Sequence, residues 1–426
     1  MRLIDGHYSV RSAPPRRSDG GAIGATGDRG DWRTGDVADT VTRMRLESID
    51  TLVSRILSEI GDPDGAVVPG IQPATTFRRG SDGELIGDFS YRRTSSPTIK
   101  AVEGVLNRLD GGEGCLVFSS GMAAINAFFG AQPRGVRVAA PTVMYHGAQD
   151  WLHRLDERGD IKLTLFERLD TEGLIEAVAE GCDIAWIESP LNPTWEVFDI
   201  AAAAEATHAA GCLLAVDSTV APPVTTRPLD LGADIVFHSA SKYLNGHSDV
   251  TAGALITRRA DEAWAETEAI RVLLGSAPSP FDAWLLLRGL RTLGVRYRRA
   301  SESALRFAER TEMIEGVQQA LYPGLASHPH HEIAKRQMTG GFGGMLSVLV
   351  DGPDTAAAAA AATGIFTAAT SLGGPESLIE HRAPVEGPHS VVPDNLLRLS
   401  VGLEGADDLI ADFEEAMAAA RGRGGR

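Results

Sequence analysis

A lysine stands directly behind an apolar run in the stretch ADIVFHSASKYLNGHSD, residues 233–249. The chain uses lysine sparingly, since it contains only Lys100, Lys162, Lys242 and Lys335. Removing an ammonium group from water is costly, so a lysine at the end of a core strand needs a reason to be there. Lys242 is therefore either a surface residue that extends its amine to solvent or an amine prepared for covalent chemistry.

Other side chains that can do chemistry follow neighbouring apolar runs. Asp217 ends the run CLLAVD, Asn192 follows the run DIAWIES, and Tyr145 follows the run VRVAAP. In a doubly wound parallel sheet the ligand lies beyond the carboxyl ends of the strands. We therefore expect a carboxylate, an amide, an aromatic ring and the amine of Lys242 at one edge of a sheet.

Hydroxyl and glycine residues in two segments could hold an anion at the same edge. The segment GCLVFSSGMAAINAFFG predicts an apolar helix that begins near its SSGM residues. The first turn of a helix offers free backbone N–H groups and the positive end of the helix dipole, which together bind phosphate. The candidates in the two segments are Ser119, Ser120, Gly121, Met122, Ser239 and Ser241.

This combination fits one cofactor, pyridoxal 5′-phosphate (PLP). Its aldehyde needs a lysine amine, its pyridine nitrogen needs a carboxylate, and its ring and phosphate need an aromatic partner and N–H or hydroxyl donors. No single feature is specific, because an aspartate after a strand and a serine before a helix are commonly only helix caps. The prediction of PLP therefore depends on the joint placement of these residues.

The elements that must position these side chains alternate along the chain. Apolar runs typical of buried strands occur at VRVAAP, IKLTLF, CDIAWIES, CLLAVDS, ADIVFHSA and GALIT, with helical patterns between most of them. This alternation predicts an α/β fold with a mostly parallel sheet and flanking helices. We expect residues 101–295 to form this PLP-binding α/β domain.

Three further parts are expected around this domain. Residues 1–43 are rich in Gly, Arg, Asp and Ser without periodicity, which predicts a flexible N-terminal extension. Residues 44–100 contain a short helix pattern followed by a loop-rich arm. Residues 296–426 mix helical patterns, including SALRFAERTEMIEGVQQAL and the alanine run at 356–362, with the short strands GMLSVLV and LLRLSVGL. This last part predicts a smaller C-terminal α+β domain.

The composition excludes several classes of function. The net charge of −17 and the pI near 5.1 argue against a nucleic-acid partner, which favours a basic face. No apolar run approaches the ~20 residues that span a bilayer, so we expect no membrane partner. The N-terminus lacks an apolar signal-peptide core, and we therefore expect a cytoplasmic protein.

The residues that often bind metals do not have metal-site spacing here. The cysteines at 115, 182 and 212 lie in apolar segments without a CxxC pair, so we expect neither a metal site nor a disulfide. The histidines of SHPHHEIAK are close in sequence but lack the i, i+4 spacing of helical metal ligands. His238 and His247, which flank Lys242, are interpreted as structural residues rather than catalytic ones.

Longer motifs resemble the Cys/Met-metabolism family of PLP enzymes, which includes cystathionine γ-synthase, cystathionine γ- and β-lyases, methionine γ-lyase and O-acyl-homoserine sulfhydrylases. The motifs occur in the order typical of the family from about residue 50 to the C-terminus: YRRTSSPT, SSGMAAI, ESPLNPT, VDST, HSASKYLNGHSD, SLGGPESLIEH and RLSVGLE. The resemblance implies a PLP-dependent fold type I protein and favours the chemical interpretation of Lys242.

The resemblance also implies roles for individual residues. Lys242 would form the Schiff base with PLP and then move protons between Cα and Cβ of the substrate. Asp217 would pair with the pyridine nitrogen, Asn192 would bond the 3′-oxygen of the cofactor, and Tyr145 would stack on the ring and act as an acid or base. Arg398 would bind the substrate carboxylate, with Ser371 nearby.

The resemblance also implies that residues of two subunits bind each PLP phosphate, so the protein would be an oligomer. Gly121, Met122, Ser239 and Ser241 would bind the phosphate of their own subunit, whereas Tyr91 and Arg93 would reach the phosphate of a neighbouring subunit. Active sites would therefore form at the interface of a homodimer, and two such dimers would form a homotetramer.

Departures from the family pattern lie near the substrate. The chain has YHGAQD where the family often has YGGT or, in methionine γ-lyases, YGCT, and it has Thr370 where γ-acting members often carry glutamate. Ser95 and Ser96 replace a glycine–asparagine pair, and IEHRAPVEGPHS replaces the usual IEHPATMTH pattern. These changes weaken an assignment to any one ordinary member of the family.

Several reactions are open at this point. The main prediction is elimination or replacement at Cγ of an L-amino acid, as in cystathionine γ-synthase or γ-lyase, with room for a specialised substrate such as a γ-halogenated amino acid. A C–S β-lyase and an O-acylhomoserine sulfhydrylase are alternatives within the family. A PLP aminotransferase, a PLP decarboxylase and a non-catalytic PLP-binding protein are alternatives of other classes.

Overall fold

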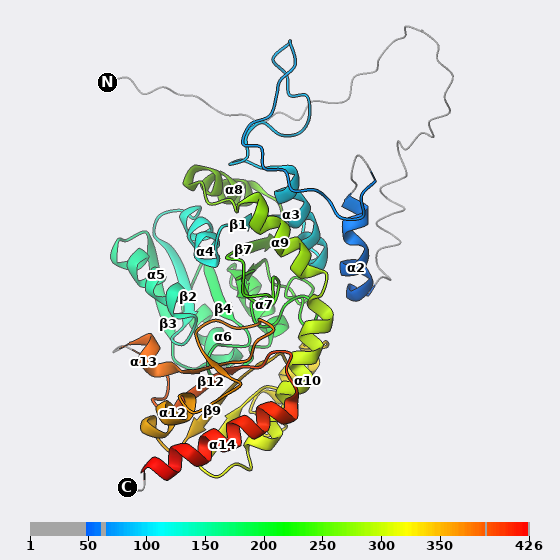
Figure 1. Ribbon diagram of the computed structural model, residues 1–426. Helices are drawn as coiled ribbons and strands as arrows, with labels where there is room; N and C mark the ends of the chain where they lie inside the picture. Colours follow the sequence, from blue (N-terminus) through cyan, green and yellow to red (C-terminus); the bar gives the residue numbers. More distant parts are fainter. Residues whose placement is uncertain (1–47, 61–64, 388–389, 425–426) are drawn as a thin grey trace. The chain divides into compact units, whose positions relative to one another are not determined.

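The computed structural model describes residues 48–60, 65–387 and 390–424, and Figure 1 shows the course of the chain. The N-terminal extension expected at residues 1–43 lies outside these residues. Residues from Ser48 onward form one compact unit. No helix in the described ranges has the length and apolarity needed to cross a membrane.

A seven-stranded sheet forms the larger half of this unit, in the order β1-β7-β6-β5-β4-β2-β3. Only β7 runs antiparallel to its neighbours, so the predicted mostly parallel α/β sheet is confirmed. Strand β1 was not predicted from the sequence, where its short apolar run joins the following helix through two serines. The strands are β1 (Gly114–Phe118), β2 (Val136–Pro141), β3 (Ile161–Phe166), β4 (Ile184–Glu188), β5 (Leu213–Asp217), β6 (Ile235–His238) and β7 (Gly253–Thr257).

Helices cover both faces of this sheet because its strands are apolar on both sides. In β4, Ile184 and Trp186 pack with α4 and α5 on one face, whereas Ala185 and Ile187 pack with α6 and α7 on the other. This alternation follows from the two-residue period of a strand. The helices of this half and the arm before it are α2 (Ile49–Ile60), α3 (Pro97–Asp110), α4 (Gly121–Gly130), α5 (His146–Glu157), α6 (Thr171–Ala179), α7 (Ile200–Ala209), α8 (Glu262–Leu274) and α9 (Pro280–Leu290).

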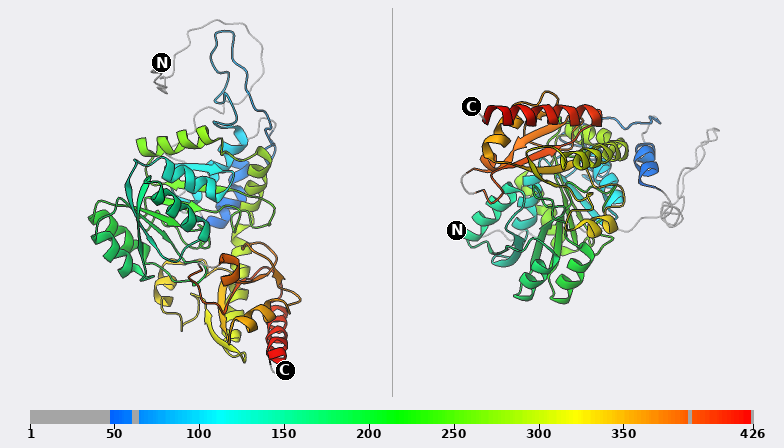
Figure 2. Two further views of the ribbon diagram at one scale, coloured as in Figure 1. Left: turned by 90° about the vertical axis from the view of Figure 1, so that its left-hand side faces the viewer. Right: turned by 90° about the horizontal axis from the view of Figure 1, so that it is seen from below.

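A five-stranded sheet with the order β10-β11-β12-β9-β8 forms the smaller half. Figure 2 shows α12 and α14 beside this sheet, where they share one apolar core with it. The strands are β8 (Val317–Leu321), β9 (Met345–Val350), β10 (Thr367–Ala368), β11 (Leu378–His381) and β12 (Leu396–Ser400). The helices are α10 (Leu293–Thr311), α11 (His331–Gln337), α12 (Pro353–Ala360), α13 (Arg382–Glu386) and α14 (Ala406–Gly424).

The structure confirms one predicted helix in this half and shortens another. The alanine run forms most of α12, as its high helix propensity predicts. The helical pattern expected through residue 321 is wrong at its end, because α10 stops at Thr311, Gly316 takes a φ of +92°, and VQQAL pairs with β9 as a strand. The boundary expected at residues 295 and 296 falls within α10 and stays a prediction.

Candidate active site

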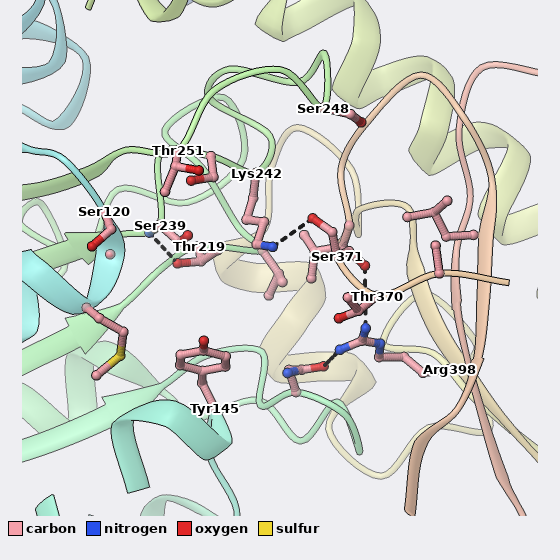
Figure 3. Close-up of a pocket in the computed structure, with 18 of the residues that line it drawn as sticks. Ser120, Tyr145, Thr219, Ser239, Lys242, Ser248, Thr251, Thr370, Ser371 and Arg398 are labelled. Atoms are coloured by element: carbon pink, nitrogen blue, oxygen red, sulfur yellow. Dashed lines mark hydrogen bonds between the residues drawn. The ribbon is translucent and has the colours of Figure 1, made fainter. Parts of the chain in front are cut away.

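A cavity of about 860 Å³ lies where the carboxyl ends of the parallel strands face the smaller sheet. Figure 3 shows Ser120, Thr219 and Ser239 at one end of it and Arg398 at the other, with Lys242 between them. Most of the residues predicted to form the site line this one cavity: Gly121, Met122, Tyr145, Asn192, Asp217, Ser239, Ser241, Lys242, Ser371 and Arg398.

Lys242 follows strand β6, and its side chain points into the cavity (Figure 3). Its Nζ donates a hydrogen bond of 2.8 Å to the Oγ of Ser371, a residue with a φ of +94°. Burial, followed by the neighbouring cation Arg398, lowers the pKa of Lys242 to about 8. A substantial part of this amine is therefore neutral near neutral pH, as a nucleophile or base requires.

Asp217 ends strand β5 as a buried carboxylate with one oxygen left for a ligand. Its Oδ1 accepts hydrogen bonds from the backbone N–H and the hydroxyl of Thr219, at 2.9 and 2.6 Å. Its Oδ2 has no protein partner among the described residues, although Asp217 lines the cavity. Burial raises the pKa of Asp217 to about 6, against the Thr219 hydrogen bonds. A cationic N–H donor at this position would favour the charged carboxylate.

Glu188 lies beside Asp217 in the register of β4 and β5 and holds two site loops. Its Oε2 accepts a hydrogen bond of 2.8 Å from the backbone N–H of Tyr145, and its Oε1 accepts one of 3.2 Å from that of Asn192. Burial raises the pKa of Glu188 well above its ordinary value, and the charge of Asp217 adds to this effect. Glu188 therefore positions the residues that carry the aromatic ring and the amide.

Tyr145 precedes helix α5, and its ring folds back over Gly147. A Cβ atom added to Gly147 would lie 2.8 Å from Cε1 of Tyr145, closer than two carbon atoms tolerate. The glycine therefore permits the ring to face the cavity, where Figure 3 shows it opposite Lys242. Burial raises the pKa of Tyr145, so its hydroxyl stays protonated at neutral pH.

Most of the phosphate candidates line the cavity near the start of helix α4, but Ser119 does not, and its N–H bonds the carbonyl of Ser276 at 2.7 Å. Ser120 caps the helix by accepting a hydrogen bond of 3.0 Å from the N–H of Ala123, and the N–H groups of Gly121 and Met122 remain without helical partners. A Cβ atom on Gly121 would come within 3.4 Å of the Ser239 side chain, so glycine keeps this cradle open. The hydroxyl of Ser241 instead bonds the backbone of residue 252.

Arg398 projects from strand β12 at the opposite end of the cavity. Its Nη1 donates to Oδ1 of Asn192 at 3.3 Å, and its Nη2 donates to the carbonyl of Ser371 at 3.4 Å. Glu380 forms an ion pair of 2.8 Å with the same Nη2. Burial lowers the pKa of Arg398 to about 10, with Glu380 opposing the shift. The guanidinium is charged at neutral pH and suited to a carboxylate.

Tyr91 and Arg93 do not reach this cavity in their own chain. They line a separate hollow of about 290 Å³ together with residues near Ser279, and the Arg93 guanidinium lies 5.6 Å from the Tyr91 ring centroid. Tyr91 is 47% exposed. Their expected role toward a neighbouring subunit stays a prediction.

Thr219, Glu188 and Arg382 are among the cavity residues that were not predicted from the sequence. Thr219 follows Asp217 by two positions, and such a hydroxyl after a strand-end aspartate is a usable sign of a local turn that holds the carboxylate. Glu188 ends strand β4 just as Asp217 ends β5, so the same strand-end criterion applied to it. Arg382 lies in the altered IEHRAPVEG segment, and no local pattern marks it as a cavity residue.

Two histidines outside the cavity have structural partners. His238 is fully buried, and its Nε2 lies 3.2 Å from Oδ1 of Asp110, which matches its interpretation as a structural residue. The Nδ1 of His330 accepts a hydrogen bond of 2.9 Å from the backbone N–H of Val197. These rings therefore orient the core and a loop.

Comparison with known proteins identifies the family. The sequence pattern of the Cys/Met metabolism PLP-dependent enzyme family matches residues 50–418. The chain belongs to this family. It is similar to cystathionine γ-synthase of Mycobacterium tuberculosis, with 42% identity over 360 residues that cover 83% of this chain and 92% of the relative. It is also similar to cystathionine γ-lyase of Dictyostelium discoideum, with 38% identity and coverages of 83% and 93%.

A solved structure agrees with this assignment. Cystathionine γ-synthase of Xanthomonas oryzae in complex with aminoacrylate and cysteine superposes with a TM-score of 0.84 and 36% identity, over 88% of this chain and 99% of that chain. The predicted family, fold and cofactor are therefore confirmed, and this Cys/Met metabolism enzyme uses PLP. Its residues fit that cofactor, because the free Oδ2 of Asp217 and the open glycine cradle at Gly121 suit a ring N–H and a phosphate.

Proposed function

We propose that this enzyme catalyses elimination or replacement at Cγ of an L-amino acid that carries a leaving group there. The observation that carries the proposal is the position of the Lys242 amine, which bonds Ser371 at 2.8 Å between the Asp217 end and the Arg398 end of one cavity. The similarity to γ-synthases and γ-lyases over more than four-fifths of the chain supports chemistry at this carbon.

In this proposal the two ends of the cavity bind different parts of the reactants. Asp217 would hold the ring nitrogen of PLP, and the first turn of α4 with Ser239 would hold its phosphate. Arg398 would bind the substrate carboxylate, while Asn192 and Glu380 keep its guanidinium in place. PLP, when bound, supplies an electron sink for the electron pair left at Cα after deprotonation.

Lys242 would carry the protons of the reaction. Chemistry at Cγ requires one proton to leave Cα and a second to leave Cβ, so the base must reach both carbon atoms. The Lys242 side chain is flexible, it is only partly buried, and its pKa near 8 leaves it able to accept and return a proton. Tyr145 would cover the opposite face of the ring and exclude water from it.

We further propose that each active site is completed by a second copy of this chain. Tyr91 and Arg93 lie outside the cavity of their own chain, on an arm that also exposes Val67 and Ile86, at 68% and 66%. Exposed apolar side chains on such an arm favour burial in an interface. The proposed assembly is a homodimer, with a tetramer built from two such dimers.

Mixing two inactive variants tests this sharing of sites. Lys242→Ala destroys the amine of its own site, and Arg93→Ala would remove the phosphate ligand given to the partner's site. In an equal mixture that has exchanged subunits, about half of the dimers are mixed, and each mixed dimer has one intact site of two. The mixture should therefore regain up to about a quarter of the wild-type activity. If the mixed dimers form and stay inactive, Arg93 does not act across the interface.

The leaving group belongs to the same proposal. His146 and Thr370, which depart from the family pattern, both line the cavity, so a rebuilt pocket for a specialised substrate such as a γ-halogenated amino acid is one form of the proposal. A panel of cystathionine, O-acetyl- and O-succinyl-homoserine, methionine, a γ-halogenated amino acid and cysteine tests it. Release of 2-oxobutyrate and ammonia, or formation of a thioether from an O-acyl-homoserine and added cysteine, supports Cγ chemistry. Release of pyruvate from cystathionine or cysteine alone would overturn it.

A further inference from the structure

A buried arginine binds the histidine that follows Tyr145. The Nη2 of Arg382 lies 3.0 Å from Nδ1 of His146, although the two residues are 236 positions apart. The same guanidinium donates to Glu380 from Nη1 and to Glu386 from Nε, each at 2.8 Å. Arg382 is only 2% exposed, and both it and His146 line the cavity.

This contact decides the chemical form of His146. A guanidinium has hydrogen-bond donors only, so Nδ1 of His146 must be the acceptor and carries no hydrogen. The ring hydrogen therefore resides on Nε2, and a second proton on Nδ1 would set two N–H groups against each other. Burial and the charge of Arg382 lower the pKa of His146, Arg398 adds to this, and Glu386 and Asp150 oppose it. His146 is thus a neutral imidazole with a single donor.

The donor edge of His146 is available to a ligand. Nε2 has no protein partner among the described residues, and the ring packs edge-on against the Tyr145 ring at a centroid distance of 4.9 Å. A neutral imidazole is too weak an acid to protonate a leaving thiolate, but its N–H can bond an oxygen acceptor. A departing carboxylate needs no proton, because its ordinary pKa is near 4, whereas a departing thiolate has a pKa near 8.5.

We infer that His146, held by Arg382, determines substrate specificity by donating its Nε2–H to the carbonyl oxygen of an acyl group on the substrate's Cγ oxygen. This inference rests on the proposed function. In the step concerned, the Cβ proton goes to Lys242, the electron pair of the Cβ–H bond forms a Cβ–Cγ double bond, and the Cγ–O bond breaks with its electron pair on oxygen, so that the acyl group leaves as a carboxylate. The hydrogen bond strengthens as negative charge develops on that group. Arg382 is a positioning residue that keeps the donor on Nε2.

The test is a binding comparison on the holoenzyme. Nγ-acetyl-L-2,4-diaminobutyrate has the acyl carbonyl but a poor leaving group, and L-norleucine has a similar length without an acceptor. His146→Leu should weaken calorimetric binding of the acetyl compound about 5- to 10-fold, the usual range for one lost hydrogen bond, and leave norleucine binding unchanged. His146→Gln keeps one acceptor and one donor on a planar group and should restore binding to within about 2-fold of wild type.

Arg382→Gln provides a second readout that a merely structural role would not move. A glutamine can turn its carbonyl toward Nδ1, which allows His146 to take a second proton. The ratio of the two affinities, acetyl compound over norleucine, should vary more steeply with pH between 6 and 8 in this variant than in the wild type, and an equal pH dependence in the two proteins would overturn the positioning role of Arg382. Glu380 retains Arg398 as a partner and Glu386 retains Ser390, so neither carboxylate is left unpaired.

Three results would overturn the inference: equal loss of both ligands in His146→Leu, no loss of either, or no restoration in His146→Gln. A failure of the proposed function would look different. In that case the wild-type holoenzyme would convert no Cγ-substituted amino acid at all, while the calorimetric comparison would still report whether His146 contacts the acyl carbonyl.

Discussion

The amine of Lys242 should react with acylating reagents at a pH where other lysines are inert. With a pKa of about 8, roughly 24% of this amine is neutral at pH 7.5, whereas an ordinary lysine with a pKa near 10.4 is only about 0.1% neutral. The difference in nucleophilic fraction is therefore roughly 200-fold. The physical cause is burial at the end of β6, followed by the repulsion of Arg398.

Competitive acetylation of the protein stripped of PLP measures this directly. Trace acetic anhydride is added at a series of pH values, and mass spectrometry of the peptides reports the labelled fraction of each lysine. Lys162 and Lys335 are exposed and provide internal references in the same tube. Labelling of Lys242 should rise with pH through a midpoint near 8. A midpoint at 10 or above would refute the argument from burial.

A variant separates the two causes. Arg398→Met removes the cation that ranks second after burial, so the midpoint of Lys242 labelling should move to higher pH. Glu380 keeps its 2.8 Å bond to Arg382 in this variant, so the change does not leave a bare carboxylate near the amine. An unchanged midpoint would assign the whole shift to burial.

Three further perturbations test the parts of the site and the core. Asp217→Asn should retain bound PLP absorbance and lose about two orders of magnitude or more in kcat, because the ring nitrogen loses its charged partner. Gly147→Ala should lower kcat/KM by roughly 10-fold or more, because its Cβ would lie 2.8 Å from the Tyr145 ring and displace it, and normal kinetics would contradict that packing. Burial lowers the pKa of His238, but the charge and hydrogen bond of Asp110 and the smaller effects of Asp217 and Ser218 together raise it above its ordinary value. The pair with Asp110 therefore stabilises the fold below the histidine pKa of the unfolded state, and this contribution is lost as pH rises through the pKa of the folded state. Asp110→Asn should therefore cost about 3–5 kcal/mol of unfolding free energy at pH 5.5 and distinctly less at pH 8.5, and a pH-independent loss in urea titrations would contradict the charged pair.

Several cavity residues could be predicted from the sequence, because the ends of the buried strands can be recognised in the sequence. Apolar runs mark β4, β5 and β6, and the polar residue that ends or follows each run must lie at one edge of a parallel sheet. Asp217, Asn192 and Lys242 were predicted on this basis to lie together, and they line one cavity. Strand β1 was not predicted, because no turn sequence separates its apolar run from helix α4.

Other contacts within the cavity join residues that are far apart in sequence. Glu188 lies beside Asp217 because β4 and β5 are aligned in register, and its carboxylate fixes the loops of Tyr145 and Asn192. Arg382 lies 3.0 Å from His146 across 236 positions of sequence, and no local pattern records that contact.

The sequence by itself determined the positions of Lys242, Asp217 and the anion-binding first turn of α4, because the apolar runs and the helix start that carry them are short-range features. Only the tertiary structure decided the protonation of these groups. The pKa of Lys242 depends on burial and on Arg398 of strand β12, and the tautomer of His146 depends on Arg382, the first residue of helix α13. Electrostatic energies are set by burial and by distances of a few ångströms between residues far apart in sequence, and folding alone creates those distances.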